Sequence, residues 1–291
     1  MNNAFLFPGQ GSQSIGMGKD LYESLPEAKR ILDLACEVLN YDLKKIMFEG
    51  SEEKLTDTRY AQPAIYTCSA MYLEKAKRQE LDFSYAAGHS LGEYSALYAA
   101  GIFSFTDGLA LVDKRGQAMA SENGKGIMAA VMGLPEEELK TVVETQKNVV
   151  MANLNTKTQI VISGKASEVN AVIEELDGRE SVITRKLAVS GAFHSPQMKN
   201  VAKVIESELK RIKMREPRIY VVSNVTGELT KDLEEIKANL IAQITGQVRC
   251  YASVIALKEA GVEQFYECGN GNVLRKLNRA ITLIPKCLPV C

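Results

Sequence analysis

Apolar and polar residues follow two different patterns along this chain, and the change between them divides it into three parts. In the first and last parts, short apolar runs are followed by longer segments in which apolar residues recur with helical spacing. Strands that alternate with helices in this way predict a mainly parallel sheet covered on both faces. The expected strands are 4–7, 82–87, 220–224 and 264–267, and the expected helices are 21–40, 41–51, 65–77, 91–100, 106–119, 198–214, 233–244, 253–260 and 273–281.

The middle part, 126–192, has another order of elements. Strands expected at 126–133, 148–153, 159–163 and 181–189 enclose helices expected at 135–146 and 167–176, which gives the order βαββαβ. This order is typical of the ferredoxin-like fold. We therefore predict an α/β protein in which a larger α/β-hydrolase-like domain, 1–125 and 193–291, is interrupted by a ferredoxin-like subdomain at 126–192.

The composition excludes several classes of protein. The chain has 291 residues, 46% of them hydrophobic and 24% charged, and a net charge of -1, which argues against a nucleic-acid binder. No apolar run approaches the length of a membrane span, and the start of the chain lacks the regions of a secretory signal. Six scattered cysteines and only two histidines argue for reduced thiols and against a zinc site. We expect a cytoplasmic monomer without a metal.

The segment 88–92, Gly-His-Ser-Leu-Gly, fits the G-x-S-x-G nucleophile elbow. The pattern alone is weak, because it arises by chance in roughly one such chain in ten. A predicted strand before it and a predicted helix after it are the setting that an elbow requires, and Gly88 and Gly92 leave room for the sharp turn. The alternative interpretation is that Ser90 caps an ordinary buried helix.

A serine hydroxyl becomes a nucleophile near neutral pH only with a base in hydrogen-bond reach, and histidine is the usual base. His89 and His194 are the two candidates. His89 is adjacent to Ser90, where successive side chains diverge, so we expect His194 to be the base. The alternative is that His194 is a hydrogen-bonded loop residue, which leaves Ser90 without an evident base.

An elbow serine works with an oxyanion hole formed by backbone N–H groups. One comes from the residue after the nucleophile, here Leu91, and another from a neighbouring loop. The glycine-rich turn around Gln10 follows the first predicted strand, where loops that bind ligands cluster in α/β sheets. Taken alone, this turn is equally compatible with a plain connection.

Six short motifs occur together in this chain. They are 7–13 (FPGQGSQ), 61–64 (AQPA), 88–94 (GHSLGEY), 114–119 (KRGQAM), 159–164 (QIVISG) and 191–195 (GAFHS). As a set they closely resemble the malonyl-CoA:acyl-carrier-protein transacylase family, and the resemblance covers about residues 4–281.

The resemblance implies a role for each of five residues. Ser90 is the nucleophile that becomes acylated, and His194 acts as base and then as acid. The backbone N–H groups of Gln10 and Leu91 form the oxyanion hole. Arg115 binds the malonyl carboxylate, a role that suits the fork of a guanidinium group.

Three further site residues follow from the same resemblance. Gln62 and Phe193 are expected to contact the substrate, and the ring of Phe193 is expected to disfavour a 2-methyl group. The histidine is expected to be oriented by a main-chain carbonyl, which alignment on 253–254 places near Arg249. The chain departs from the family pattern at 247–250 and at 269–271, where Gly-Asn-Gly replaces Gly-Pro-Gly.

The implied reaction is a ping-pong transfer of malonyl from malonyl-CoA to Ser90 and then to the phosphopantetheine thiol of acyl carrier protein, with no cofactor. Carriers of fatty-acid and of polyketide synthesis are both compatible acceptors. The alternatives are an acyl hydrolase or esterase of the same fold and a catalytically silent subunit that docks carrier proteins. Arg115 argues against a hydrolase of neutral esters, and the pair of Ser90 and His194 argues against a silent subunit.

Overall fold

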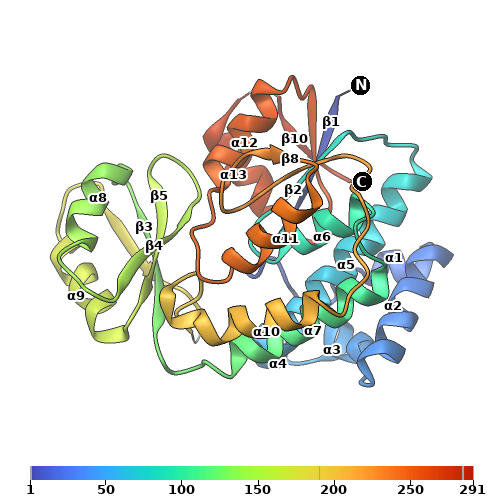
Figure 1. Ribbon diagram of the computed structural model, residues 1–291, viewed down its shortest axis with the longest axis horizontal. Helices are drawn as coiled ribbons and strands as arrows, with labels where there is room; N and C mark the ends of the chain where they lie inside the picture. The colour runs from blue at the N-terminus through green and yellow to red at the C-terminus, as the bar shows by residue number, and fades with distance from the viewer. Residues whose placement is uncertain (1, 190, 284, 291) are drawn as a thin grey trace.

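A six-stranded sheet forms the centre of the larger part of the computed structural model, which describes residues 2–189, 191–283 and 285–290 (Figure 1). Its strand order is β10-β9-β1-β2-β7-β8, and all neighbouring pairs are parallel except β7 and β8. The central strand β1 is buried along its whole length, as expected for a parallel strand covered on both faces. The strands are β1 (Asn3–Phe7), β2 (Tyr85–Gly88), β7 (Tyr220–Val222), β8 (Leu229–Thr230), β9 (Gln264–Glu267) and β10 (Cys287–Pro289).

Alternate residues of β1 pack into two different hydrophobic cores. Phe5 and Phe7 belong to the larger core, whereas Ala4 and Leu6 face the helices α12 (Cys250–Glu259) and α13 (Val273–Ile281). The helices of the larger core are α1 (Lys19–Ser24), α2 (Pro26–Leu39), α3 (Leu43–Glu49), α4 (Glu52–Thr56), α5 (Thr58–Arg78), α6 (Gly92–Ala99), α7 (Phe105–Ala120), α10 (Lys199–Leu209) and α11 (Leu233–Ala242).

The smaller part is a four-stranded antiparallel sheet with the order β4-β5-β3-β6 (left in Figure 1). Its strands are β3 (Ile127–Met132), β4 (Val149–Leu154), β5 (Gln159–Gly164) and β6 (Ile183–Lys186), and its helices are α8 (Glu136–Val143) and α9 (Ala166–Leu176). Both helices pack on the same face, where a separate core contains Ala129 and Val131. This is the predicted βαββαβ arrangement, and the predicted α/β class is confirmed.

The division at 126 and 192 stays a prediction, which the separate core of the smaller part supports. The two parts are also joined away from these boundaries. The backbone of Val248, from the larger part, accepts a hydrogen bond from Leu154 N–H and donates one to the Ala152 carbonyl at 2.8 Å each. Strand β4 is thereby held against the segment that leads into α12.

Several expected elements differ from those observed. The helix expected at 21–40 is two helices, because Pro26 starts α2 and Leu25 before it is extended. Helix α5 begins at Thr58, earlier than expected, and continues through Pro63. Ser104, not Thr106, caps α7 by accepting from Asp107 N–H at 3.1 Å. The short strands β8 and β10 and the helix α4 were not expected.

No helix in the described part of the chain is both long and apolar enough to cross a membrane.

Candidate active site

Three loops of the larger part meet at the carboxyl ends of neighbouring parallel strands. Gln10 follows β1, Ser90 follows β2, and Asn224 follows β7. Because β1 pairs with β2 and β2 with β7 in parallel, the three loops leave the sheet on the same side, at the carboxyl ends of the strands. The carboxyl ends of the strands are where α/β proteins bind ligands.

Ser90 lies on a sharp turn between β2 and α6, and its φ of 52° is in the left-handed region that side chains other than glycine rarely adopt. A Cβ on Gly88 would collide with the backbone of Gly92, and a Cβ on Gly92 would collide with the carbonyl of Phe7. Asn224 holds the turn from the side: its Oδ1 accepts from Ser90 N–H at 2.7 Å and its Nδ2 donates to the Gly88 carbonyl at 2.6 Å. The two glycines and Asn224 therefore fix the serine in the elbow conformation.

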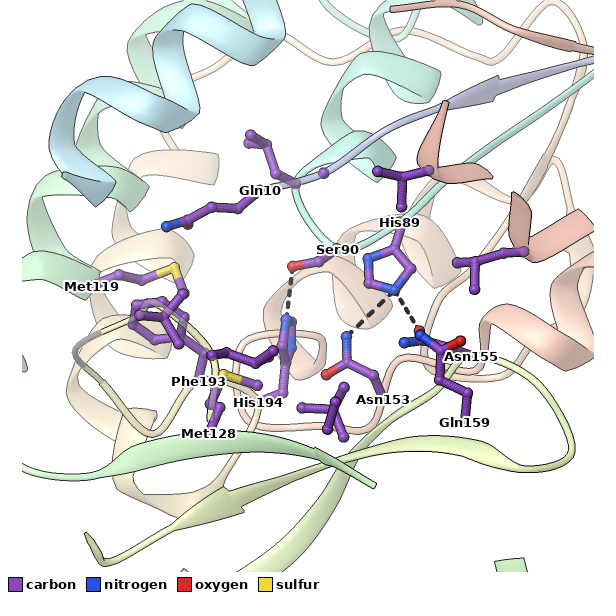
Figure 2. A pocket seen from close by; sticks show the side chains of 18 of the residues that line it. Gln10, His89, Ser90, Met119, Met128, Asn153, Asn155, Gln159, Phe193 and His194 are labelled. Atoms are coloured by element: carbon purple, nitrogen blue, oxygen red, sulfur yellow. Dashed lines mark hydrogen bonds between the residues drawn. The ribbon is translucent and has the colours of Figure 1, made fainter. Parts of the chain in front are cut away.

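His194 is the histidine that lies at the serine (Figure 2). Its Nε2 is 2.7 Å from Ser90 Oγ, and its Nδ1 is 2.8 Å from the backbone carbonyl of Gln243. Because the carbonyl can only accept, Nδ1 carries the proton and Nε2 is free to accept one from the serine. Burial lowers the pKa of His194 to about 3, and the positive charge of Arg115 contributes. The imidazole is therefore neutral, as a base must be.

The expectation that the Arg249 carbonyl orients His194 is wrong. That carbonyl accepts from the N–H and the hydroxyl of Ser253, both at 2.9 Å, in the first turn of α12. Gln243 instead follows the last residue of α11, where helix carbonyls have no partner within the helix. The negative end of the helix dipole there also favours an imidazolium ion.

His89 points away from the serine and toward the smaller part of the molecule (Figure 2). Its Nε2 lies 2.7 Å from Asn155 Oδ1 and 3.5 Å from Asn153 Nδ2, and burial lowers its pKa. It connects the elbow to β4 and to the loop after β4.

Arg115 projects from α7 to the serine and is only 1% exposed. Its Nη2 donates to Ser90 Oγ at 3.2 Å and to Gln243 Oε1 at 3.1 Å, and its Nη1 donates to Gln62 Oε1 at 2.8 Å. Its Nε is buried and has no partner among the described residues. A buried guanidinium group thus keeps unused donors within reach of the nucleophile.

Gln62 contacts Arg115 instead of lining the cavity at the serine. It is completely buried, and besides Arg115 it contacts Met119, to whose sulfur its Nε2 lies at 3.3 Å. Its contact with substrate stays a prediction, and the contact that the structure shows is with the arginine that the sequence assigned to the substrate.

Gln10 and Leu91 line the same cavity as the serine. Within the described part of the chain, neither backbone N–H donates a hydrogen bond. Leu91 precedes α6, so its N–H lies at the positive end of that helix. The loop of Gln10 is held by Asn270, whose Nδ2 donates to the Ser12 carbonyl at 2.7 Å. Asparagine in place of the family's proline thus supports this loop.

The cavity has a volume of about 410 Å³ and lies between the two parts of the molecule. On one side the cavity is bounded by the small sheet, whose face with Met128 and Ala130 lines it. The helices α8 and α9 cover the opposite face of that sheet. Phe193 and Met119 lie close together on one side of Ser90 and His194, as Figure 2 shows. They form an apolar wall beside the reacting atoms.

Three polar residues of the site were not expected from the sequence: Gln243, Glu93 and Asn224. All are buried, and Glu93 Oε2 accepts from Gln243 Nε2 at 2.7 Å while Glu93 Oε1 accepts from Asn224 N–H at 3.3 Å. Burial raises the pKa of Glu93 to about 7. Polar residues next to apolar runs at the ends of predicted elements were the available signal, because buried polar groups require partners.

No group of three or more His, Cys, Asp or Glu side chains that could hold a metal ion is present in the ranges that the structure describes.

The chain was compared with known protein families, sequences and structures. Residues 4–266 match the family model described as "Acyl transferase domain". The chain is 44% identical to the malonyl CoA-acyl carrier protein transacylase of Bacillus subtilis (strain 168), over 97% of this chain and 92% of that protein. It is 41% identical to the polyketide biosynthesis protein ThaF of Burkholderia thailandensis, but it spans only 24% of that longer protein.

Solved structures of similar proteins agree with these matches. The acyl-carrier-protein S-malonyltransferase of Bartonella henselae superposes with a TM-score of 0.95 at 37% identity, over 100% of this chain and 95% of that one. A malonyl-transacylase solved in complex with its type II PKS acyl-carrier protein superposes with a TM-score of 0.93 at 33% identity, over 99% of this chain and 95% of that one.

Proposed function

From the premise that the chain belongs to the malonyl CoA-acyl carrier protein transacylase family, we propose that it transfers a malonyl group from malonyl-CoA to the phosphopantetheine thiol of an acyl carrier protein. Similar proteins bear this activity in their names, and one of them is solved with its carrier. The enzyme is accordingly an acyltransferase whose partners are a coenzyme A thioester and a carrier protein.

One observation carries the choice of substrate. Arg115 is buried beside the nucleophile with unused N–H donors, and no carboxylate of the described residues lies within 4.0 Å of it. A buried charge without a counter-ion is unfavourable for folding. A substrate that brings its own carboxylate supplies the missing partner, and malonyl-CoA does so.

The first half-reaction acylates the serine. As Ser90 Oγ attacks the thioester carbon, its proton passes to Nε2 of His194, while the Gln243 carbonyl stabilises the resulting imidazolium ion. The backbone N–H groups of Gln10 and Leu91 are the donors for the tetrahedral oxyanion. The intermediate then collapses: the carbon–sulfur bond breaks, the imidazolium proton goes to the sulfur, and coenzyme A leaves as a thiol.

The second half-reaction reverses these roles. The thiol of the carrier's phosphopantetheine arm gives its proton to His194 and attacks the malonyl ester of Ser90. The same two N–H groups hold the oxyanion, and the proton returns to Ser90 Oγ as the ester bond breaks. The fork of Arg115 holds the malonyl carboxylate through both halves, so that the acyl group stays oriented while the two thiols exchange.

These steps use only side chains and backbone groups, and we propose that the enzyme works without a cofactor. A cytoplasmic location and a monomeric state stay predictions. Carriers of fatty-acid and of polyketide synthesis stay open as acceptors, because one similar protein is named for polyketide biosynthesis and the name of another specifies no pathway.

An acyl hydrolase of the same fold is the second candidate. It would need water at the acyl-enzyme, whereas Phe193 and Met119 provide an apolar wall beside the reacting atoms. A hydrolase of neutral esters would also have no use for the charge of Arg115. A silent carrier-docking subunit does not account for a serine and a histidine at 2.7 Å.

The test of the proposed function is the acyl-enzyme itself. On incubation with malonyl-CoA, the wild type should gain the mass of one malonyl group, and added carrier protein should remove it. The Ser90→Ala variant should gain no mass while keeping its fold, which circular dichroism checks. Rapid loss of the acyl group to water without carrier would instead identify a hydrolase, and absence of any acyl-enzyme would identify a silent subunit.

A further inference from the structure

Within the described part of the chain, the groups in direct contact with the Arg115 guanidinium are electrically neutral. Its guanidinium nitrogens donate to the amide oxygens of Gln62 and Gln243 and to the hydroxyl of Ser90, and the ring of Tyr94 lies 5.2 Å from the guanidinium carbon. Each of these groups fixes the position of the guanidinium, and none of them cancels its charge.

The carboxyl group of Glu93 is connected to the arginine through the amide of Gln243. Gln243 Nε2 donates to Glu93 Oε2 at 2.7 Å, while Gln243 Oε1 accepts from Arg115 Nη2 at 3.1 Å. The amide is thus bound to the acid through its nitrogen and to the cation through its oxygen. Its orientation is fixed by the guanidinium, which can only donate and therefore requires the amide oxygen on its side.

Buried cations are usually paired with carboxylates, and a glutamate at position 62 would have a similar shape. Position 243 differs, because the amide nitrogen of Gln243 also donates to Glu93 and to the Ser90 carbonyl, which a glutamate could not do. A glutamate would also hold the guanidinium more firmly, because hydrogen bonds between charged groups are about twice as strong as neutral ones. Rigidity of Arg115 alone therefore does not explain the glutamine at position 62. Neutrality does, because an arginine already paired with an internal carboxylate has little attraction left for the carboxylate of a substrate.

We propose that Gln62 and Gln243 are specificity-determining residues: as neutral acceptors they position Arg115 without neutralising it, and so reserve its charge for an acyl group that bears a carboxylate. This inference rests on the proposed malonyl transfer and adds to it the reason why the site prefers a charged acyl group to a neutral one of similar size.

Gln62 is the better position to test, because it contacts neither Ser90 nor His194 among the hydrogen bonds of the described residues. Gln62→Glu keeps the acceptor and the approximate shape but adds a negative charge. Gln62→Met removes the acceptor and adds no charge. For each protein, kcat/KM is measured for malonyl-CoA and for acetyl-CoA from the rate of acyl-enzyme formation, and the thermal unfolding temperature checks the fold.

The proposal predicts that Gln62→Glu lowers the malonyl-to-acetyl ratio of kcat/KM by roughly 10- to 100-fold, because the added carboxylate competes with and repels that of the substrate. Gln62→Met should lower the ratio less, since Arg115 keeps its charge. A purely structural role predicts the opposite order, with the methionine variant more damaged than the glutamate variant. That order, or an unchanged ratio in Gln62→Glu, would overturn the proposal.

Two further measurements keep the outcome interpretable. If Gln62→Glu does not fold, Gln62→Asp places the same charge on a shorter side chain and should lower the ratio in the same direction. If the wild type itself does not prefer malonyl-CoA to acetyl-CoA, the proposed function fails. If it does prefer malonyl-CoA and the glutamate variant keeps that preference, only the inference about the amides fails.

Discussion

Two arginines on helices of the larger part have opposite surroundings. Arg275 on α13 has a side chain that is 32% exposed, and its Nε donates at 3.0 Å to Glu267, a carboxylate that is 1% exposed. Glu267 also accepts from the backbone N–H groups of Leu274 and Arg275 at the start of that helix. Arg115 on α7 is 1% exposed, and its hydrogen-bond partners among the described residues are all neutral.

The more deeply buried arginine thus lacks the counter-ion that the more exposed one has. For folding alone the reverse would be expected, because the penalty for an unpaired charge grows with burial. Arg275 and Glu267 serve the fold, since they join β9 to the first turn of α13. Arg115 departs from the rule that buried charges are paired, and it does so beside Ser90, where a substrate carboxylate can supply the missing negative charge. A departure of this kind indicates function more clearly than burial alone.

The largest effect is expected from removing the unpaired arginine. Arg115→Ala should lower kcat/KM for malonyl-enzyme formation roughly 10²- to 10⁴-fold, because two charge-assisted hydrogen bonds to the malonyl carboxylate are lost. The rate is measured by quenching the reaction at set times and determining the fraction of acyl-enzyme by mass spectrometry. Arg275→Ala is the matched control and should stay within about threefold of the wild type. Equal losses in both variants would remove the functional distinction between the two arginines.

A smaller effect, on stability instead of activity, is expected at the paired arginine. Glu267→Gln should lower the free energy of unfolding by about 1–3 kcal/mol, because a buried acceptor of several N–H groups loses its charge and one of its acceptor oxygens. Urea unfolding measures this change. The malonyl-to-acetyl ratio should not move, in contrast to the change expected for Gln62→Glu. A large fall in the ratio would mean that Glu267 acts on the site as well.

The smallest effect concerns pH and again separates the two arginines. The titratable groups that face His194 are Arg115, His89 and, across Gln243, Glu93. Because the pKa of His194 is lowered, to about 3, its neutral form persists well below pH 6.5, and acylation should not lose its base between pH 8 and 5. Arg115→Ala removes one cause of the lowered pKa of His194. With acetyl-CoA, the fall of the acylation rate at low pH should therefore occur at a higher pH in Arg115→Ala than in Arg275→Ala.

Glu93 titrates within the same range of pH, since burial raises its pKa to about 7. The Glu93→Gln variant therefore serves as the control, because any inflection near pH 7 that belongs to this carboxyl should vanish in it. A wild-type acid limb near pH 6.5 that persists in Glu93→Gln would contradict the lowered pKa of His194.

The sequence predicted most of the fold because its signals are local. The apolar run 4–7, the helical spacing of 273–281 and the order of strands and helices in 126–192 each follow from the periodicity of a single element. Differences arose where one residue changed a boundary. Pro26 separates two helices within one apolar pattern, and Pro63 is accommodated inside α5 although proline usually ends a helix.

The sequence predicted the residues that act on substrate more completely than the residues that position those catalytic and binding groups. Ser90, His194 and Arg115 have characteristic neighbours in sequence, and the structure brings them together. The carbonyl that orients His194 could not be located in this way, because any residue has a carbonyl. The carbonyl that is available to His194 depends on where α11 ends and on how that helix packs. The orienting carbonyl was therefore assigned to Arg249, whereas it belongs to Gln243.

The central claim is that Arg115 binds the carboxylate of the acyl group, and one ratio tests it most directly. With malonyl-CoA and acetyl-CoA in competition, the malonyl-to-acetyl ratio of kcat/KM is compared between the wild type and Arg115→Ala. Damage to the fold, to Ser90 or to His194 affects both substrates and cancels in this ratio. The account predicts a fall of at least about 100-fold, since only malonyl-CoA loses a charged partner. An unchanged ratio would contradict it, because Arg115 would then not distinguish a charged acyl group from a neutral one.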